Sequence, residues 1–93
     1  MVYAYAKLII KNPDSLALYR DQAGAALARH GGKVKAASKD TTVLDGTPDM
    51  PDVGALLSFP DRASALAWAN DPELEEIHAL RRDAGRSDIV LLS

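Results

Sequence analysis

The stretch VYAYAKLIIKNPD at positions 2–14 decides the first half of the fold, because a strand pattern in it leads directly into a helix start. Hydrophobic residues fill both alternating faces of Val2–Ile10, which is typical of a strand covered on both sides. Asn12 suits a helix N-cap, Pro13 suits the first helical position, and Asp14 favours the positive end of the helix dipole. The sequence therefore predicts a buried strand followed at once by a helix.

The predicted helix ends at Gly31-Gly32, because glycine adopts the left-handed conformation of a helix end without steric cost. Its apolar stripe recurs at three- and four-residue spacing and consists of Leu16, Tyr19, Ala23, Ala26, Leu27 and His30. The later elements are predicted from alternation, caps and turn residues. They are strand character at Val34 and Thr41–Leu44, a strand over Val53–Phe59, a helix from the Asp61 cap to Ala69, its continuation from the Asp71 cap to Gly85, and a short strand over Ser87–Leu92.

This order of strand, helix, strand, strand, helix, strand predicts an α+β fold of the ferredoxin-like kind. Such a fold has a four-stranded antiparallel sheet with both helices on one face. The other sheet face would then be uncovered, although the first strand is apolar on both sides. We therefore expect a second copy of the chain to cover it, with a cleft for a small ligand between the two sheets.

Length and composition place the chain among small globular proteins. It has 93 residues, 47% of them hydrophobic and 26% charged, which is ordinary for one domain over residues 1–93. It has no cysteine, which excludes disulfides, thiol nucleophiles and thiolate metal sites. No apolar run approaches the roughly 18 residues that span a bilayer, and the N-terminus does not resemble a signal peptide. We expect a cytoplasmic protein without membrane attachment.

Charge is unevenly distributed along the chain. Residues 1–39 hold seven Lys or Arg and two Asp, whereas residues 40–93 hold four Lys or Arg and eleven Asp or Glu. Two interpretations fit this pattern. In the first, the charges lie on solvated surfaces of the helices and strands. In the second, the basic first half of the chain attracts an anionic ligand. His30 and His78 lack metal-ligand spacing, and the sequence has neither a phosphate-binding glycine loop nor an RNA-stacking strand. We expect no metal, no cofactor and no nucleic-acid partner.

Short motifs also follow one another in a recognisable order along nearly the whole chain. They are Tyr5 in the first strand, Asn12-Pro13-Asp14 with Tyr19, His30-Gly31-Gly32-Lys33, Val43-Leu44-Asp45-Gly46, Ser58-Phe59-Pro60, Ala67-Trp68, Asp71-Pro72-Glu73-Leu74, Leu80-Arg81 and Ser87-Asp88-Ile89-Val90-Leu91. In this order and spacing they resemble the family named domain of unknown function 1330, which falls within the dimeric α+β barrel group.

The resemblance implies a homodimer whose two sheets face each other and enclose a pocket. The wider group includes cofactor-independent monooxygenases, isomerases, cyclases and dehalogenases, whereas this family has no generally established reaction. The chain departs from the family pattern at three positions, where Ser58 replaces an acid, Asp45 a glutamate and Leu74 an aromatic residue. The changes at Ser58 and Leu74 remove a carboxylate and a phenol from the neighbourhood of any family site.

Three residues are candidates for catalysis. His30 titrates near neutral pH and follows a helix C-terminus, where it serves either as a cap or as an acid or base. Arg81 lies on the apolar side of the second helix, where its charge requires a carboxylate. Asp45 is the predicted structural partner of Arg81, and a substrate carboxylate is the alternative.

Four further residues are candidates for ligand binding. Tyr5 and Lys7 share one strand face and are predicted to line the cleft between the sheets. Tyr19 and Trp68 combine apolar rings with hydrogen-bonding groups, which suits either core packing or a pocket wall.

The sequence leaves three functional classes open. One is a cofactor-independent enzyme of monooxygenase, isomerase or cyclase type, in which His30, Asp45 or Arg81 would converge on one cavity. Another is a protein that binds a small organic molecule in a pocket of Tyr, Leu and Ile without catalysis. The third is a structural dimer module, in which the partner's side chains fill the sheet face.

Overall fold

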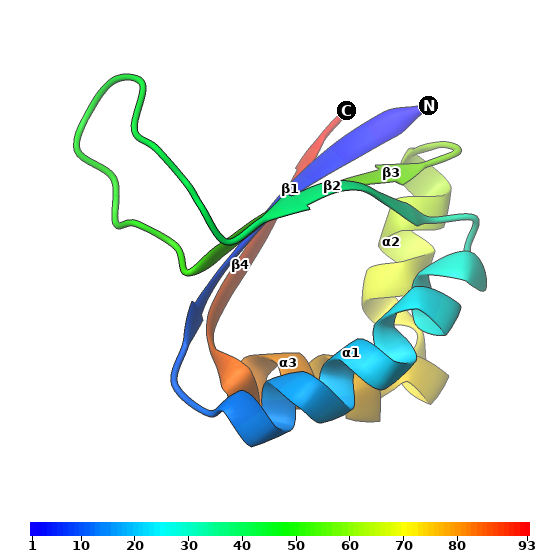
Figure 1. The fold of residues 1–93 in the computed structure, drawn as a ribbon. Coiled ribbons are helices and arrows are strands. Elements are labelled where there is room, and N and C mark those ends of the chain that lie inside the picture. The colour runs from blue at the N-terminus through cyan, green and yellow to red at the C-terminus, as the bar shows by residue number, and fades with distance from the viewer.

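The computed structural model describes residues 1–93, with strands and helices in the predicted order. In chain order the elements are β1 (Val2–Ile10), α1 (Pro13–Ala28), β2 (Lys33–Ser38), β3 (Val53–Phe59), α2 (Arg62–Asn70), the 3₁₀ helix η1 (Pro72–Leu74), α3 (Glu75–Ala84) and β4 (Gly85–Leu92). The strands form one antiparallel sheet in the order β2-β3-β1-β4. The helices lie on one face of it, which confirms the predicted α+β ferredoxin-like fold (Figure 1).

Side-chain caps place the helix starts where the sequence predicts them. The Asn12 side chain accepts a hydrogen bond from the backbone N–H of Ser15, and Asp61 accepts one from Ser64 at 2.8 Å. Asp71 caps η1 by accepting from the backbone N–H of Glu73 at 2.9 Å. Each cap satisfies an N–H group that has no partner inside its own helix, so the chain turns into the helix at that point.

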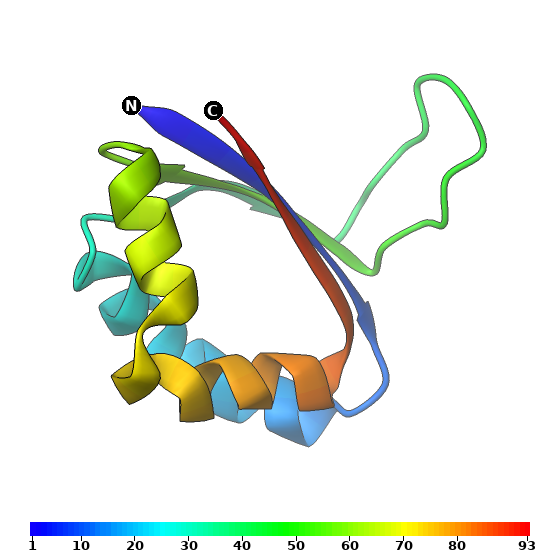
Figure 2. The same cartoon turned by 180° about the vertical axis from the view of Figure 1, so that it is seen from behind.

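The segment between β2 and β3 differs from the prediction. Thr41–Leu44 is not a strand but part of a long loop, residues 39–52, which projects from the sheet on the side away from the helices (Figure 2). Its β-branched residues find no neighbouring strand, and strand propensity alone does not form a strand without pairing. The last strand also differs, because β4 begins at Gly85 rather than Ser87 and pairs with β1 from Ile10 onward.

Gly85 joins α3 to β4 without any connecting loop. A Cβ atom at this position would lie 1.8 Å from the carbonyl oxygen of Ile9, so only glycine allows the close approach of the two strands. The carbonyl of Ala84 next to it accepts from the backbone N–H groups of Lys11 and Asn12, at 2.7 and 2.9 Å. The end of α3 is thereby tied to the connection between β1 and α1.

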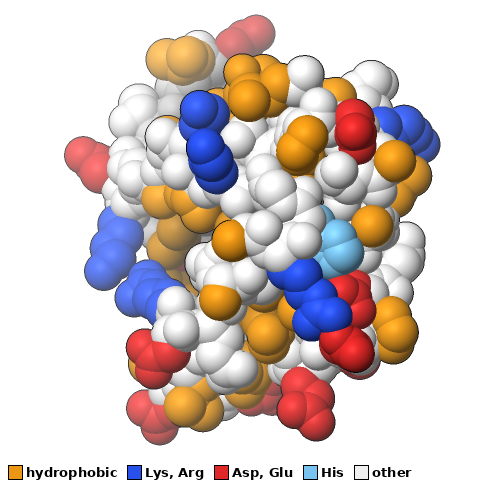
Figure 3. All heavy atoms as spheres, turned by 90° about the vertical axis from the view of Figure 1, so that its right-hand side faces the viewer, with side chains coloured by type: hydrophobic (Ala, Val, Ile, Leu, Met, Phe, Trp, Pro, Cys, Tyr) orange, Lys and Arg blue, Asp and Glu red, His pale blue; other side chains and the backbone are white.

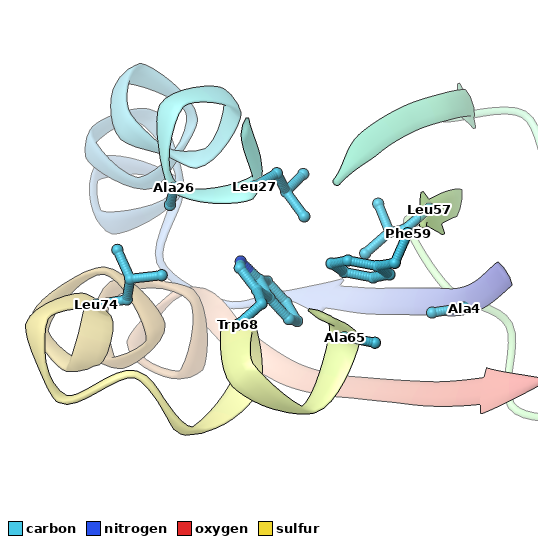
Figure 4. Close-up of a cluster of buried hydrophobic side chains, with 8 residues drawn as sticks. All are labelled: Ala4, Ala26, Leu27, Leu57, Phe59, Ala65, Trp68 and Leu74. Atoms are coloured by element: carbon cyan, nitrogen blue, oxygen red, sulfur yellow. The ribbon is translucent and has the colours of Figure 1, made fainter. Parts of the chain in front are cut away.

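Two clusters of buried side chains hold the helices to the sheet. The larger one is drawn in Figure 4 and consists of Ala4, Ala26, Leu27, Leu57, Phe59, Ala65, Trp68 and Leu74. Within it the rings of Phe59 and Trp68 pack with their centroids 5.6 Å apart. The smaller one consists of Leu8, Leu16 and Ala84. None of the helices combines the length and apolar character needed to cross a membrane.

Candidate functional site

Two adjacent cavities lie between the helices and the sheet. One encloses about 350 Å³ and is lined by residues of β1, β3, β4, α2 and α3, and the other encloses about 310 Å³ under α1. Arg81, Ser87 and Ile89 line both, so the two cavities meet at these residues. The second cavity is also bordered by Leu8 and Leu16 from the smaller core cluster and by members of the larger one, which places the space between the two clusters.

The walls of both cavities are mainly apolar, and every charged residue in them is basic. The apolar lining of the larger cavity includes Phe59, Ala65, Trp68, Ile89 and Leu91. The charged lining residues are Lys7, Arg20, Arg81 and Arg82, and neither cavity is lined by Asp or Glu. Arg82 is paired with Glu75 at 2.8 Å on the exposed side of α3. The remaining three cations form no salt bridge within the chain.

Arg81, in the last turn of α3, occupies the junction between the cavities. Its guanidinium lies over two aromatic rings, 5.7 Å from the centroid of Tyr19 and 5.4 Å from that of Trp68. Its Nη1 is 2.8 Å from Nδ1 of His78, whereas its buried Nε has no hydrogen-bond partner. Aromatic faces attract a cation, so the two rings and the histidine hold the guanidinium in one orientation.

His78 is the residue that positions Arg81. It is 1% exposed, and its Nε2 lies 2.9 Å from the carbonyl oxygen of Trp68. A carbonyl only accepts, so Nε2 carries the proton and donates to it, which leaves Nδ1 free to accept from Arg81. The imidazole also packs edge-on against the Trp68 ring, with centroids 4.8 Å apart. Each polar atom of the His78 ring is therefore used inside the protein.

Burial lowers the pKa of His78 from its ordinary value of 6.5, because the charged form would lose its hydration. The positive charges of Arg81 and Arg82 lower the pKa further. The Trp68 carbonyl and Glu75 act in the opposite direction, but their effects are smaller than the combined effect of burial and the two arginines. His78 is thus held in the neutral form that can accept the hydrogen bond from Arg81.

The predicted partnership of Arg81 with Asp45 is wrong. Asp45 is exposed in the 39–52 loop and takes part in no salt bridge, whereas the partner of Arg81 is His78, three residues earlier on the same helix. The sequence pattern around His78 shows no metal-ligand spacing and does not by itself indicate this contact. The three-residue spacing from Arg81 was the available signal, since it places both side chains on one helix face.

His30 is held in a separate polar cluster outside both cavities. Its Nε2 lies 2.9 Å from the Asp71 carboxylate, which is also 3.3 Å from Nε of Arg29, and Arg29 pairs with Glu73. Figure 3 shows acidic and basic side chains meeting beside a histidine on this side of the molecule. The hydrogen bond with His30, the backbone N–H of Glu73 and the charge of Arg29 lower the pKa of Asp71. The cluster joins the end of α1 to η1.

Tyr5 and Lys7 lie on the same face of β1, the open face of the sheet, because Tyr5 pairs with Val90 and Lys7 with Asp88. Tyr5 lies in a shallow hollow beside β2 and β3 on this face, and Lys7 also borders the cavity under α1. Tyr19 lines the cavity under α1, and Trp68 lines the larger one while its ring packs in the core. Of the seven predicted site residues, the structure brings Tyr19, Trp68 and Arg81 into direct contact. No three His, Asp or Glu side chains gather in a geometry suited to a metal ion.

Comparison with known proteins identifies the family and the fold. The family model described as domain of unknown function (DUF1330) matches residues 1–93. A protein of unknown function from Rhodopseudomonas palustris superposes with a TM-score of 0.73 at 21% identity, over 98% of this chain and 79% of that one. A ferredoxin-like protein of unknown function from Jannaschia sp. CCS1, described as dimeric, gives a TM-score of 0.66 at 15% identity, over 99% and 97%.

A protein described as an antibiotic biosynthesis monooxygenase has the same fold, with a TM-score of 0.56 at 17% identity over 100% of this chain and 97% of that one. At these identities the likeness concerns the fold alone. No curated protein matches the sequence.

Proposed function

The chain belongs to the DUF1330 family, and from the geometry of its interior we propose that it binds a small organic molecule between its helices and its sheet. The observation that carries this proposal is the pair of adjoining cavities, of about 350 and 310 Å³, whose apolar walls surround the polar group of Arg81. Small-molecule sites are typically apolar cavities of roughly 300–1,000 Å³ with a few well-placed polar groups.

This location differs from the cleft between two sheets that the sequence suggested. The hollow on the open face, beside Tyr5, is shallower and lined by the edge of the sheet and the 39–52 loop. Arg81, Trp68 and Tyr19 all lie on the helix side of the sheet. The arginine and the two aromatic rings that can orient a ligand therefore lie together inside one copy of the chain.

Binding explains the arrangement better than catalysis by the predicted residues. His30 and Asp45 lie outside both cavities, and His78 has each ring nitrogen engaged within the protein. General acid–base catalysis requires a titratable group within hydrogen-bond reach of the reacting atom. A cofactor-independent enzyme is the alternative, and it would require turnover of the bound molecule.

A titration monitored by ¹H–¹⁵N NMR tests the proposal, because Trp68 is the single tryptophan of the chain and its indole N–H gives one resolved signal. We expect members of a set of small aromatic and aliphatic acids, amides and alcohols to shift this signal saturably. The variant Ser87→Leu fills the junction of the cavities and abolishes the shift, whereas Ser93→Leu, at the exposed chain end, keeps it. Absence of any saturable shift would overturn the proposal.

The open face of the sheet supports a further part of the proposal, a homodimer. Four large apolar side chains lie side by side on this face, across β1 and β4. They are Tyr3 (39% exposed), Tyr5 (45%), Val90 (56%) and Leu92 (59%). A second copy would bury this apolar surface, and a related structure is described as dimeric. Native mass spectrometry is expected to give twice the chain mass for the wild type and a monomer for Val90→Asp. A monomeric wild type would exclude this dimer.

A further inference from the structure

The charges around the cavities contrast with the charge of the whole chain. The sequence has 13 Asp and Glu against 11 Lys and Arg, a formal net charge of −2. Both cavities are nevertheless lined by basic residues and by no acidic one. Arg20 is exposed and Lys7 lies across from Asp88 on the open face of the sheet, so Arg81 is the half-buried cation of the cavity walls, and the chain supplies no acidic partner to it.

One donor edge of the Arg81 guanidinium has no acceptor within the chain. Nη1 is used by His78, whereas neither Nε nor Nη2 donates to a protein acceptor. Nε–H and the adjacent Nη2–H point in parallel, which matches the two oxygens of a carboxylate. Because His78, Tyr19 and Trp68 already fix the group, little conformational freedom is lost when an anion binds to it.

Trp68 carries a second buried donor without a protein acceptor. Its Nε1 is buried without any hydrogen-bond partner, although the side chain is 5% exposed. In Figure 4 this nitrogen points away from Phe59, toward the side of α1. Buried donors are nearly always satisfied, so the unpaired Nε of Arg81, at the junction of the two cavities, marks a place for an acceptor that does not belong to the chain.

From these contacts we propose that the ligand of the cavities is an organic acid with an apolar body, whose carboxylate is bound by the Nε edge of Arg81. This inference rests on the proposed function and names its ligand class. The apolar body packs against the aromatic and aliphatic wall formed by Trp68, Ile89 and Leu91, while the carboxylate lies at the junction of the cavities. The ring of Tyr19 shields the guanidinium from the α1 side.

Matched acid and amide pairs test the inference with the same NMR signal. The pairs are phenylacetate and phenylacetamide, indole-3-acetate and indole-3-acetamide, and hexanoate and hexanamide. Each amide keeps the size and apolar body of its acid but removes the negative charge. Charge-assisted hydrogen bonds predict that the wild type binds an acid about tenfold or more tightly than its amide. Arg81→Gln is expected to lose this preference and still bind the amide.

The control variant is Arg86→Gln, which removes an arginine that lies outside both cavities and pairs with Asp49 at 3.2 Å. It should keep the wild-type preference for acids. Arg81→Lys retains the charge without the planar donor edge and should show a reduced preference, so it serves if Arg81→Gln does not fold. The inference would be overturned if the wild type bound acid and amide equally well. It would also be overturned if both Arg81 variants kept the wild-type preference for acids. In either case the proposed function would stand. Binding of no acid and no amide would overturn both.

Discussion

Nδ1 of His78 accepts a hydrogen bond from Nη1 of Arg81 at 2.8 Å, and the opposite ring nitrogen of His78 contacts the carbonyl oxygen of Trp68 at 2.9 Å. The neutral imidazole can satisfy both partners at once, because it has one donor and one acceptor. A protonated imidazole would instead direct a second N–H at the guanidinium. The orientation of Arg81 therefore depends on a buried histidine that remains neutral.

The first prediction concerns the pH dependence of stability. Burial lowers the pKa of His78 in the folded chain from 6.5, so the unfolded chain binds more protons just below that pH. Stability is at its full value above pH 6.5 and decreases as the pH falls through the folded pKa, by at most about 1.4 kcal/mol per pH unit for one group. Urea unfolding at a series of pH values measures this change.

The matched variants for this measurement are His78→Gln and His30→Gln. The first removes the buried titrating group and should flatten the pH dependence between neutral pH and pH 5. The second variant removes His30, which pairs with Asp71 outside the cavities, and should leave the pH dependence of stability unchanged. A wild type whose stability does not change over this range would show that His78 is not held neutral by folding.

The second prediction separates His30 from the ligand site. His30 contacts Asp71, which caps η1, and neither residue lines a cavity. Asp71→Ala removes the cap and the contacts with Arg29 and His30, so thermal unfolding should occur several degrees lower, with unchanged affinity for any acid that binds. Loss of ligand affinity in a folded His30→Gln variant would instead place His30 in the site.

The third prediction concerns the polar contact between α1 and α3. The buried Ser15 hydroxyl donates to the Asp83 carboxylate, and the amide of Asn12 contacts both residues at 3.0 and 3.1 Å. Ser15→Ala removes the hydrogen bonds of this buried hydroxyl with Asp83 and Asn12 and should lower the free energy of unfolding by about 1–2 kcal/mol in urea titrations. Ser38→Ala, at the exposed end of β2, should change it by less than about 0.5 kcal/mol. Equal effects would refute the role of the buried contact.

The fourth prediction compares two glycines. Gly85→Ala would place a Cβ atom 1.8 Å from the carbonyl oxygen of Ile9 and should destabilise the fold by more than about 2 kcal/mol. Gly24→Ala adds a Cβ in open space within α1 and should stabilise it by about 0.5–1 kcal/mol. Thermal unfolding of both variants measures the difference. A tolerated Gly85→Ala would mean that β4 can move away from β1.

Local signals in the sequence were sufficient for the fold. Asn12, Asp61 and Asp71 each precede a helix that they cap, and these short-range interactions need no knowledge of the rest of the chain. Thr41–Leu44 has strand-forming residues but no pairing partner, so propensity was misleading there. Pairing depends on which segments meet in the folded chain, and that information is not local.

The site was only partly predictable for the same reason. Tyr19 and Trp68 were recognised as amphipathic rings, but their position on either side of Arg81 depends on how α1, α2 and α3 pack together. The pairing of Arg81 with His78 is local, at three-residue spacing on one helix, and was available from the sequence. The charge of Arg81 predicts an acidic partner such as Asp45, whereas the structure supplies the neutral imidazole of His78.

A crystal structure of the protein grown with phenylacetate tests directly whether Arg81 binds the acid. We expect the carboxylate about 2.7–2.9 Å from Nε and Nη2 of Arg81, with the phenyl ring in the cavity beside Trp68 and Ile89. An acid found instead on the open face of the sheet, against Tyr5 and with Arg81 uncontacted, would show that Arg81 does not bind the ligand.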